Sequence, residues 1–284
     1  MKPAPAIPPT ADELAVHRRL LWRIAYRMLG TASDADDVLQ EVALRWLAAD
    51  KAALHQPRAW LIAVCSRLCI DHIRRAKRQR EAYPGPWLPE PVADDRADDL
   101  SLGYLLLLQR LKTSERTVLV LHEAVGMSHG EIGAVLGRSP EACRQSLSRA
   151  KRRVAPAGSE SELRPIPRDR IVAFRAALLA GDPQQLVLLL ADEAVLLSDG
   201  GGKAVSALRP IVTADRVARF LAGIWRKRGA ELEVVEVGAN GGRGLLLRWR
   251  RGGLFGLLVP EVSPGGSLSR ILVLRNPDKL RGFA

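Results

Sequence analysis

The stretch SHGEIGAVLGRSPEACRQSLSRAKRRV, residues 128–154, decides the fold of the middle of the chain. Its first part predicts a short amphipathic helix that ends at Gly137, because its apolar residues recur at helical spacing. Ser139 then supplies an N-cap for a second helix, and Pro140 is favoured in the first turn. Two helices joined by a tight turn that contains glycine form a helix-turn-helix.

The second of these helices predicts two unlike faces. Its apolar stripe is expected to face the core and consists of Cys143, Leu147, Ala150 and Val154. The opposite face carries donor-rich side chains suited to base edges and phosphates in a major groove: Arg144, Gln145, Ser148, Lys151 and Arg152. The alternative is an ordinary helical hairpin with a solvated basic face. We expect Cys143 to be a core residue rather than a reactive thiol.

Upstream of this stretch, the pattern is helical from Asp12 to about Arg80. A helix over residues 14–29 is expected to stop at Gly30, and Thr31 or Ser33 is expected to cap the next one. The first turn of that helix is expected to hold three carboxylates, Asp34, Asp36 and Asp37, close to the positive end of the helix dipole.

A third helix is expected to begin at Pro57. One apolar face is predicted for it, made by Trp60, Leu61, Val64, Leu68 and Ile73. It ends in a basic cluster of Arg74, Arg75, Lys77, Arg78 and Arg80.

Two breaks divide the chain. Residues 82–100 hold four prolines and an acidic run (Asp94, Asp95, Asp98 and Asp99), so they predict a linker. Its residues Tyr83, Trp87 and Leu88 are too apolar for a purely solvated segment. The second break, residues 156–167, is again rich in proline.

The C-terminal part predicts an α+β domain. Amphipathic helices are expected from Arg168 to Gly181 and over residues 214–228. Strands are expected over residues 194–198, 245–250, 254–262 and 268–274. Helices followed by a sheet are typical of α+β domains.

Composition narrows the class of partner. The formal charge of +12 favours a polyanion, with nucleic acid first and a membrane surface second. Three cysteines without disulfide or zinc spacing fit a reducing cytoplasm. We expect no metal and no cofactor. A signal peptide and a membrane-spanning run of about 18 apolar residues are both missing, so we expect a cytoplasmic protein.

Ordered motifs carry a resemblance to a family. The strings YRMLG (26–30), DADDVLQE (34–41), PRAWL (57–61) and DHIRR (71–75) resemble region two of extracytoplasmic-function sigma factors. Residues 111–153 resemble region four of the same family. Three further strings, WLPEP (87–91), DGGGK (199–203) and NPDKL (276–280), resemble members with a fused SnoaL-like C-terminal domain. An ordered set of motifs is more specific than any single one.

The resemblance implies a multidomain fold: two all-α sigma domains, the second with the helix-turn-helix, then an α+β SnoaL-like domain of the cystatin-like cone type. The expected divisions are a disordered N-terminus (1–10), region two (11–81), a linker (82–100), region four (101–155), a second linker (156–167) and the SnoaL-like domain (168–284). In such proteins the last domain regulates the sigma domains in cis.

The resemblance also implies site residues and partners. Core RNA polymerase would be bound through its β′ clamp helices and β flap, and the clamp helices would contact Asp36, Asp37, Gln40 and Glu41. The promoter minus-ten element would be contacted by Arg58, Trp60, Arg67, His72, Arg74 and Arg75, and the minus-thirty-five element by the face after Ser139 described above. Each residue has a structural alternative. The acidic residues also stabilise a helix dipole, Trp60 also fits a core position, and His72 also fits a polar surface.

The loop DGGGK leaves several uses open. Consecutive glycines can bind an anion, but the spacing is neither a Walker loop nor a dinucleotide fingerprint. A tight exposed turn is one alternative. We favour an interdomain contact in which Asp199, Gly200, Gly201, Gly202 and Lys203 meet Trp87, Leu88 and Pro89 of the linker.

Two other functions are weighed against a sigma factor. SnoaL-like domains include enzymes, but every His, Cys and Tyr of this chain precedes residue 168, so we expect no enzyme. A non-enzymatic pocket for a small ligand in that domain is a stronger alternative. A helix-turn-helix regulator that acts without polymerase would leave the region-two motifs unexplained.

Overall fold

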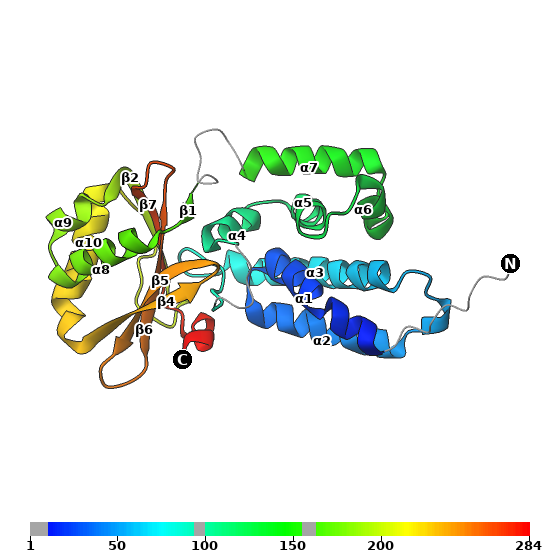
Figure 1. Ribbon diagram of the computed structural model, residues 1–284, viewed down its shortest axis with the longest axis horizontal. Coiled ribbons are helices and arrows are strands. Elements are labelled where there is room, and N and C mark those ends of the chain that lie inside the picture. Colours follow the sequence, from blue (N-terminus) through cyan, green and yellow to red (C-terminus); the bar gives the residue numbers. More distant parts are fainter. Residues whose placement is uncertain (1–10, 94–99, 155–162) are drawn as a thin grey trace. The chain divides into compact units, whose positions relative to one another are not determined.

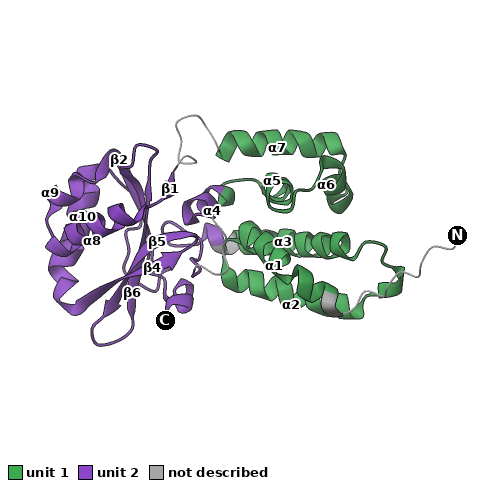
Figure 2. Cartoon of the chain, viewed as in Figure 1, with its two compact units in different colours: residues 1–77, 108–154 green, residues 78–107, 155–284 purple. Residues whose placement is uncertain are grey.

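The computed structural model describes residues 11–93, 100–154 and 163–284. The chain divides into two compact units, shown in Figure 2. Unit 1 comprises residues 1–77 and 108–154, and unit 2 comprises residues 78–107 and 155–284. The segment between the two helical regions therefore groups with the C-terminal part of the chain. The expectations for residues 1–10, for the acidic run after residue 93 and for most of the second linker lie outside the described residues.

The first helices of unit 1 are α1 (Ala11–Leu29), α2 (Ala32–Ala48) and α3 (Pro57–Glu81), whose last residues pass into unit 2 (Figure 1). Gly30 ends α1 with a φ of 80°, as expected for a helix stop. Thr31 is the N-cap residue of α2, and the expected carboxylate cluster is only partly right. Because α2 already begins at Ala32, Asp34 alone lies in its first turn, and Asp36 and Asp37 fall in the second.

Apolar side chains from these helices form the interior of the bundle. Leu61, Val64 and Leu68 of α3 are buried as predicted, together with both of its cysteines. Trp60 is only partly buried, and its ring centroid lies 5.6 Å from that of Trp46, which is fully buried.

The later helices are α4 (Leu102–Gln109), α5 (Thr113–Val125), α6 (His129–Leu136) and α7 (Pro140–Val154). The predicted helix-turn-helix is confirmed: α6 ends at Gly137, whose φ is 64°, and the Ser139 hydroxyl accepts the amide of Ala142 at 3.2 Å. Within unit 1, the buried Arg116 of α5 donates to the carbonyl oxygen of Met28 at 2.6 Å. This contact joins α5 to the end of α1.

Unit 2 is built on a mixed sheet. Its strands in chain order are β1 (Arg164–Pro165), β2 (Leu190–Asp199), β3 (Ile211–Val212), β4 (Leu232–Ala239), β5 (Gly242–Trp249), β6 (Leu254–Val262) and β7 (Leu268–Leu274). Among the described residues the spatial order is β3-β2-β7-β6-β5-β4, with β1 paired to β6. The pair β2 and β7 is parallel, and the remaining pairs are antiparallel.

One face of the sheet is covered by α8 (Arg168–Ala180), α9 (Pro183–Val187) and α10 (Ala214–Arg228), as Figure 1 shows. The core between these helices and the sheet includes Phe174, Leu196, Val217, Leu258 and Val273. The predicted α+β architecture is therefore confirmed. The helices do not all precede the sheet in sequence, because β2 and β3 lie between α9 and α10.

The other face of the sheet is also buried. Successive residues of a strand point to opposite faces, so Asp199, Leu257 and Leu272 point away from the helices. All three are buried, and so are both Leu245 and Leu246. A strand buried on both faces does not alternate between apolar and polar residues. Residues from the segments 83–93 and 100–107 contact unit 2 on this side, as described below.

Candidate nucleic-acid interface and linker contact

The exposed side of α7 gathers the residues predicted to read DNA. Arg144, Gln145, Ser148, Lys151 and Arg152 are all exposed, and their spacing places them along one side of the helix. The predicted core stripe of Cys143, Leu147, Ala150 and Val154 is buried, and Ser146 joins it. The division of α7 into a buried and a basic side is thus confirmed. We call the five exposed residues the recognition face.

Glu115 and Glu141 pair with arginines of α7. Buried Glu115 of α5 accepts Arg153 at 2.6 Å and lies 3.7 Å from Arg149. On the recognition face itself, Glu141 pairs with Arg144, and Gln145 donates to the same carboxylate at 3.3 Å. These two exposed contacts are weak enough for the side chains to exchange them for nucleic-acid partners.

The residues predicted to bind polymerase lie along α2. Asp37 and Gln40 are exposed, whereas Asp36 and Glu41 are partly buried. Asp36 accepts the indole N–H of Trp22 at 2.9 Å, and Glu41 pairs with Arg45 at 2.9 Å. Asp36 therefore has a structural contact as well as its predicted role.

Two apolar residues extend this side of α2 beyond the sequence prediction. Leu44 and Leu47 are 62% and 66% exposed, and they follow Asp37 and Gln40 at helical spacing. Neighbouring exposed leucines beside carboxylates suit a protein partner better than a purely solvated helix. We call Asp37, Gln40, Glu41, Leu44 and Leu47 the α2 face.

The residues predicted to contact the minus-ten element do not share one side of α3. With 3.6 residues per turn, Trp60, Arg67 and Arg74 fall on one side, and Arg58 and His72 fall on another. His72 points toward α2, where its Nε2 lies 3.4 Å from Asp34 Oδ1. Arg67, Arg74 and Arg75 are exposed, and Arg75 also donates to the carbonyl oxygen of Asp71 at 3.3 Å.

Asp199 at the end of β2 is the centre of a buried contact with the linker. Its carboxylate accepts the Tyr83 hydroxyl at 2.6 Å, the Leu88 amide at 2.9 Å and the Gly201 amide at 3.0 Å. The side chain is fully buried. Asp199 is therefore an interior residue. The loop considered as a tight exposed turn thus begins in the interior of unit 2.

Lys279 and Asn276 complete this contact. Lys279 Nζ donates to Asp199 at 2.7 Å and to the Leu88 carbonyl oxygen at 2.5 Å, and Asn276 Nδ2 donates to the Tyr83 hydroxyl at 3.0 Å. We call Asp199, Asn276 and Lys279 the linker-binding cluster. Both backbone groups of Leu88 are thereby bonded, so the linker can run through a buried site without unsatisfied groups.

Burial dominates the electrostatics of this cluster. Desolvation lowers the pKa of Lys279, and the adjacent Asp199 charge opposes that shift. Burial also raises the pKa of the Tyr83 phenol, and so does its hydrogen bond to the Asp199 carboxylate. Two cations lie over the Trp87 ring, with Arg80 4.0 Å and Lys279 4.2 Å from its centroid.

The remaining members of the predicted interdomain set lie around the same place. Leu88 and Pro89 are buried, as is Gly200. Gly201 has a φ of 59°, and a Cβ on it would meet Asn276 Nδ2 at 2.2 Å, so the turn requires glycine there. Lys203 is exposed and pairs with Asp278. The structure thus brings the WLPEP and DGGGK strings together within unit 2.

Two more polar contacts hold the segment farther along. Asn240 and Gly241 form the tip of the β4–β5 hairpin, both with positive φ, and Asn240 exchanges two 3.0 Å hydrogen bonds with the backbone of Val92. Near the start of α4, the Gly103 amide donates to Glu261 Oε1 at 3.1 Å. Glu261 in turn pairs with Arg270 at 2.5 Å, and both are almost fully buried.

Several of these residues were missed in the sequence. Asn276 and Lys279 belong to a string that the resemblance singled out, but no role was given to them. An Asn-Gly pair between two strands is a hairpin signal that could have located Asn240. Glu261 and Arg270 carry no local signal, because only strand pairing brings them together.

The described residues contain no cluster of three or more His, Cys, Asp or Glu side chains able to hold a metal. No helix within residues 11–93, 100–154 and 163–284 is both long and apolar enough to span a bilayer.

Comparisons with known proteins agree with this architecture. The model of Sigma-70 region 2 matches residues 14–79, and that of Sigma-70 region 4 matches residues 102–154. The chain is 37% identical over 234 residues to the ECF RNA polymerase sigma factor SigJ of Mycobacterium tuberculosis, covering 78% of this chain and 75% of SigJ. It is 31% identical over 291 residues to the probable ECF RNA polymerase sigma factor SigI of the same species, covering 96% and 95%.

The whole architecture also has a solved counterpart. The crystal structure of Mycobacterium tuberculosis SigJ superposes with a TM-score of 0.77 and 30% identity, covering 96% of this chain and 99% of SigJ. Helical sigma domains followed by an α+β domain are therefore common to both. The chain belongs to the extracytoplasmic-function family of RNA polymerase sigma factors. Sigma factors bind core RNA polymerase and promoter DNA.

Proposed function

We propose that this chain directs core polymerase to its promoters through three helical surfaces, and that its α+β domain regulates this activity in cis by holding the linker. The single observation that carries the first part is α7, where a continuous buried stripe backs an exposed basic recognition face. Such a helix can enter a major groove without exposing its core. We assign it the minus-thirty-five element and place the protein in the cytoplasm, where polymerase and DNA lie.

We assign the α2 face, together with Asp36, to the clamp helices of the polymerase β′ subunit. Exposed Asp37 and Gln40 can complement a basic partner surface, while Leu44 and Leu47 supply apolar area. We assign to the region-four domain the binding of the β flap of core polymerase.

For the minus-ten element we favour the side of α3 that carries Arg67 and Arg74, with Arg75 beside it. All three are exposed cations able to hold phosphates. Trp60 lies on the same side and is partly accessible, which suits stacking on an unpaired base. Arg58 and His72 point elsewhere, so we give them an accessory role at the edge of this contact.

Regulation in cis is supported by the linker contacts. Residues 83–92 bind the α+β domain through the linker-binding cluster and Asn240, and most of these contacts are buried. A covalently attached domain has a high effective concentration for such binding, so moderate affinity is enough. Polymerase must place the two sigma domains on separate promoter elements, and the held linker constrains that placement.

The test of the assignment is run-off transcription on genomic fragments with core polymerase and this chain alone. We expect transcripts from a subset of fragments only when the chain is added, and co-purification of the chain with core enzyme. DNA binding without either result would instead identify a helix-turn-helix regulator that acts without polymerase.

A further inference from the structure

Most of the positive charge of the chain lies in its α+β domain. Residues 163–284 hold 19 Lys and Arg against 11 Asp and Glu, so they carry a formal charge of +8 out of the +12 of the whole chain. The surfaces assigned above to DNA lie on α3 and α7, outside these residues. The proposed function thus leaves most of the positive charge without a role.

Helix α10 gathers much of this charge on one side. With 3.6 residues per turn, Arg216, Arg219, Arg226 and Lys227 fall within about 100° of one another around the helix axis. All four side chains are exposed. We call these four residues the α10 basic stripe.

Carboxylates and the helix dipole do not account for this stripe. Asp215 pairs with Arg219 at 2.9 Å, but both side chains are more than half exposed, so the pair is weak. Among the described residues no carboxylate pairs with Arg216, Arg226 or Lys227. Cations in the last turn stabilise a helix dipole, which suits Arg226 and Lys227, whereas Arg216 lies in the first turn, where a cation is unfavourable.

Gly223 lies on the same side of α10 as the stripe. A glycine in a helix interior is less stable than an alanine, and a Cβ on Gly223 would have no neighbour within 4 Å. No packing requirement therefore explains this glycine. The missing side chain leaves the backbone of α10 open to close approach by a partner.

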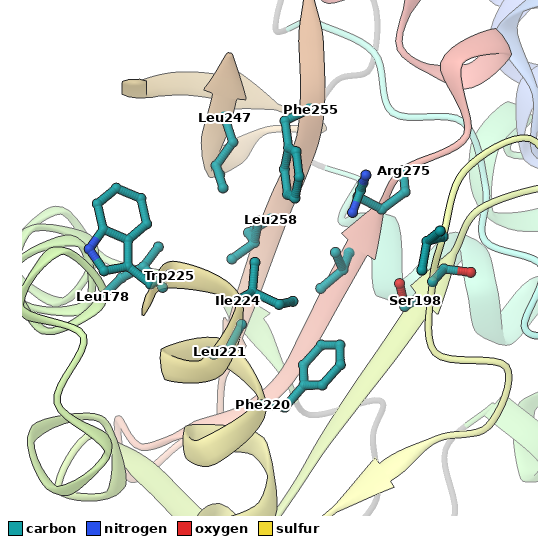
Figure 3. A pocket seen from close by; sticks show the side chains of 13 residues that line it. Leu178, Ser198, Phe220, Leu221, Ile224, Trp225, Leu247, Phe255, Leu258 and Arg275 are labelled. Carbon is teal, nitrogen blue, oxygen red and sulfur yellow. The ribbon is translucent and has the colours of Figure 1, made fainter. Parts of the chain in front are cut away.

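The opposite side of α10 is already used inside unit 2. Val217 and Leu221 are buried, and Figure 3 shows Leu221 and Ile224 lining a small apolar cavity with Leu258 of β6. A helix that lies in a membrane surface inserts its apolar side. Because α10 buries that side against the sheet, its cations are what it offers to a partner.

The turn between β5 and β6 extends the positive surface beyond the C-terminal end of α10. Arg250 and Arg251 of this turn are exposed. The Arg250 amide donates at 2.9 Å to the carbonyl oxygen of Glu231, which follows shortly after the end of α10 at Arg228. Two further cations thus lie next to that end of the helix.

We propose that the α10 basic stripe and the β5–β6 turn bind the phosphate backbone of double-stranded DNA without reading its sequence. The rise of 1.5 Å per residue puts Arg216 and Lys227 about 16 Å apart along the helix, a length over which a duplex carries about ten phosphate charges. Sigma factors bind promoter DNA, so DNA held by the rest of the chain is at high effective concentration for this surface, and a few phosphate contacts are enough. The surface lies outside the three helical surfaces of the proposed function.

Binding of the full-length chain to a fluorescent duplex of scrambled sequence, measured over a range of NaCl concentrations, tests this surface. Each phosphate contact contributes about 0.9 to the slope of log K against log salt concentration. Arg216→Gln with Lys227→Gln is therefore expected to reduce the slope by about 2, on cognate and scrambled duplexes alike. Arg216→Lys keeps the charge and is expected to keep the wild-type slope.

Arg164→Gln with Arg168→Gln is the matched control, because it removes two exposed cations of the same domain that do not lie on α10. We expect this variant to keep the wild-type slope. Circular dichroism checks that every variant stays folded. The same slope in the wild-type chain and the α10 variant would overturn the surface, and so would an equal reduction in the α10 variant and the control.

Gly223→Gln gives an independent readout. Glutamine is a better helix former than glycine, so the melting temperature of the chain is expected to rise. The added side chain also keeps a DNA backbone away from the helix, so binding to the scrambled duplex is expected to weaken. A higher melting temperature with unchanged DNA binding would indicate a merely solvated helix side and would overturn the surface.

Vesicles of phosphatidylglycerol and phosphatidylcholine test the other polyanion. Vesicle binding that is lost in Arg216→Gln with Lys227→Gln, together with unchanged DNA binding by that variant, would replace DNA by a membrane as the partner and overturn the proposal. The salt slope is measured without polymerase, and run-off transcription tests the proposed function, so the two can fail separately.

Discussion

Asp199 is the centre of the linker contact. It is fully buried, and its charge faces the ammonium of Lys279 at 2.7 Å. Asp199→Asn keeps the size of the side chain but leaves Lys279 buried without its counter-charge, which typically costs about 3 to 5 kcal/mol. We expect hydrogen exchange at residues 83–92 to become at least about tenfold faster.

Asp278→Asn is the matched control for this change. Asp278 pairs with Lys203 and Arg281, but all three side chains are well exposed, so the loss is expected to stay below about 1 kcal/mol. Equal exchange in the two variants would show that the linker is not held by Asp199.

Tyr83 gives a pH prediction at the same place. Its raised pKa means that the neutral phenol, which donates to Asp199, persists above the ordinary value of about 10. The stability that it contributes is fully present below that ordinary value and is lost as pH rises through the higher pKa of the folded state. In a tyrosinate absorbance titration, Tyr83→Phe is expected to remove a tyrosine that ionises above the ordinary value. Loss of an early-titrating tyrosine instead would contradict this.

At the scale of the element, α7 separates base contacts from phosphate contacts. Arg144 and Gln145 lie in its N-terminal half, where a recognition helix meets base edges, and Lys151 lies in its last turn. We expect Arg144→Ala to relax specificity at the minus-thirty-five element by about 1 to 3 kcal/mol, and Lys151→Ala to weaken all sequences alike. Binding titrations on cognate and scrambled duplexes measure both, and an equal loss on both duplexes for both variants would mean that the face is misassigned.

The α2 face makes a separate prediction. Reversing Asp37 and Glu41 to Lys is expected to weaken binding to core polymerase by a few kcal/mol while the helices stay folded, because neither side chain belongs to the core. A pull-down titration against core enzyme measures the affinity, and circular dichroism checks the fold. Unchanged affinity would remove the α2 face from the polymerase interface.

The helices show where sequence patterns are sufficient. Periodicity, caps and glycine stops are local, so α7, α10 and the stripe through Cys143 could be predicted from neighbouring residues alone. The division of α3 into two sides was equally available from its spacing, but the family resemblance grouped Arg58 and His72 with the others. The exposure of Leu44 and Leu47 depends on what packs against α2, which no local pattern reports.

At the scale of the whole molecule, the α+β domain is expected to control promoter output. Removing everything after Pro167 removes Asp199, Asn240 and Glu261, which are the hydrogen-bond partners of Leu88, Val92 and Gly103. We expect run-off transcription at equal protein concentration to change by more than the several-fold effect of altered abundance. An arrangement that resists separation of the sigma domains lowers output, and one that favours separation raises it.

A double variant complements the truncation. Trp87→Ala removes the ring that contacts Arg80 and Lys279, and Gly201→Pro is incompatible with a φ of 59°, so the two substitutions together are expected to reproduce part of the change. If truncated and full-length chains gave the same transcription and the same protease protection of the linker, the domain would have no regulatory role.

The contact between the linker and the DGGGK string was predicted from the family resemblance, but the contacts of this segment with Asn240 and Glu261 could not be predicted from the sequence. Prolines 84, 86, 89 and 91 indicate a break in helical structure, and a break is normally taken as a boundary. What binds such a break is decided by residues far along the chain, such as Asn240 at a hairpin tip and Glu261 beside Arg270. Their pairing is long-range and leaves no periodic signal.

The large sequence separation between the linker and the residues that bind it matters during protein synthesis. Leu88 and Lys279 are separated by 191 residues, so at about 5 to 20 residues per second the ribosome makes Leu88 roughly 10 to 40 s before its partner. Both sigma domains are complete once Val154 has been made, which is roughly 6 to 25 s before Lys279. If the α+β domain regulates as proposed, a nascent chain passes through a period in which its sigma domains are complete but not yet regulated, and translation speed sets the length of that period.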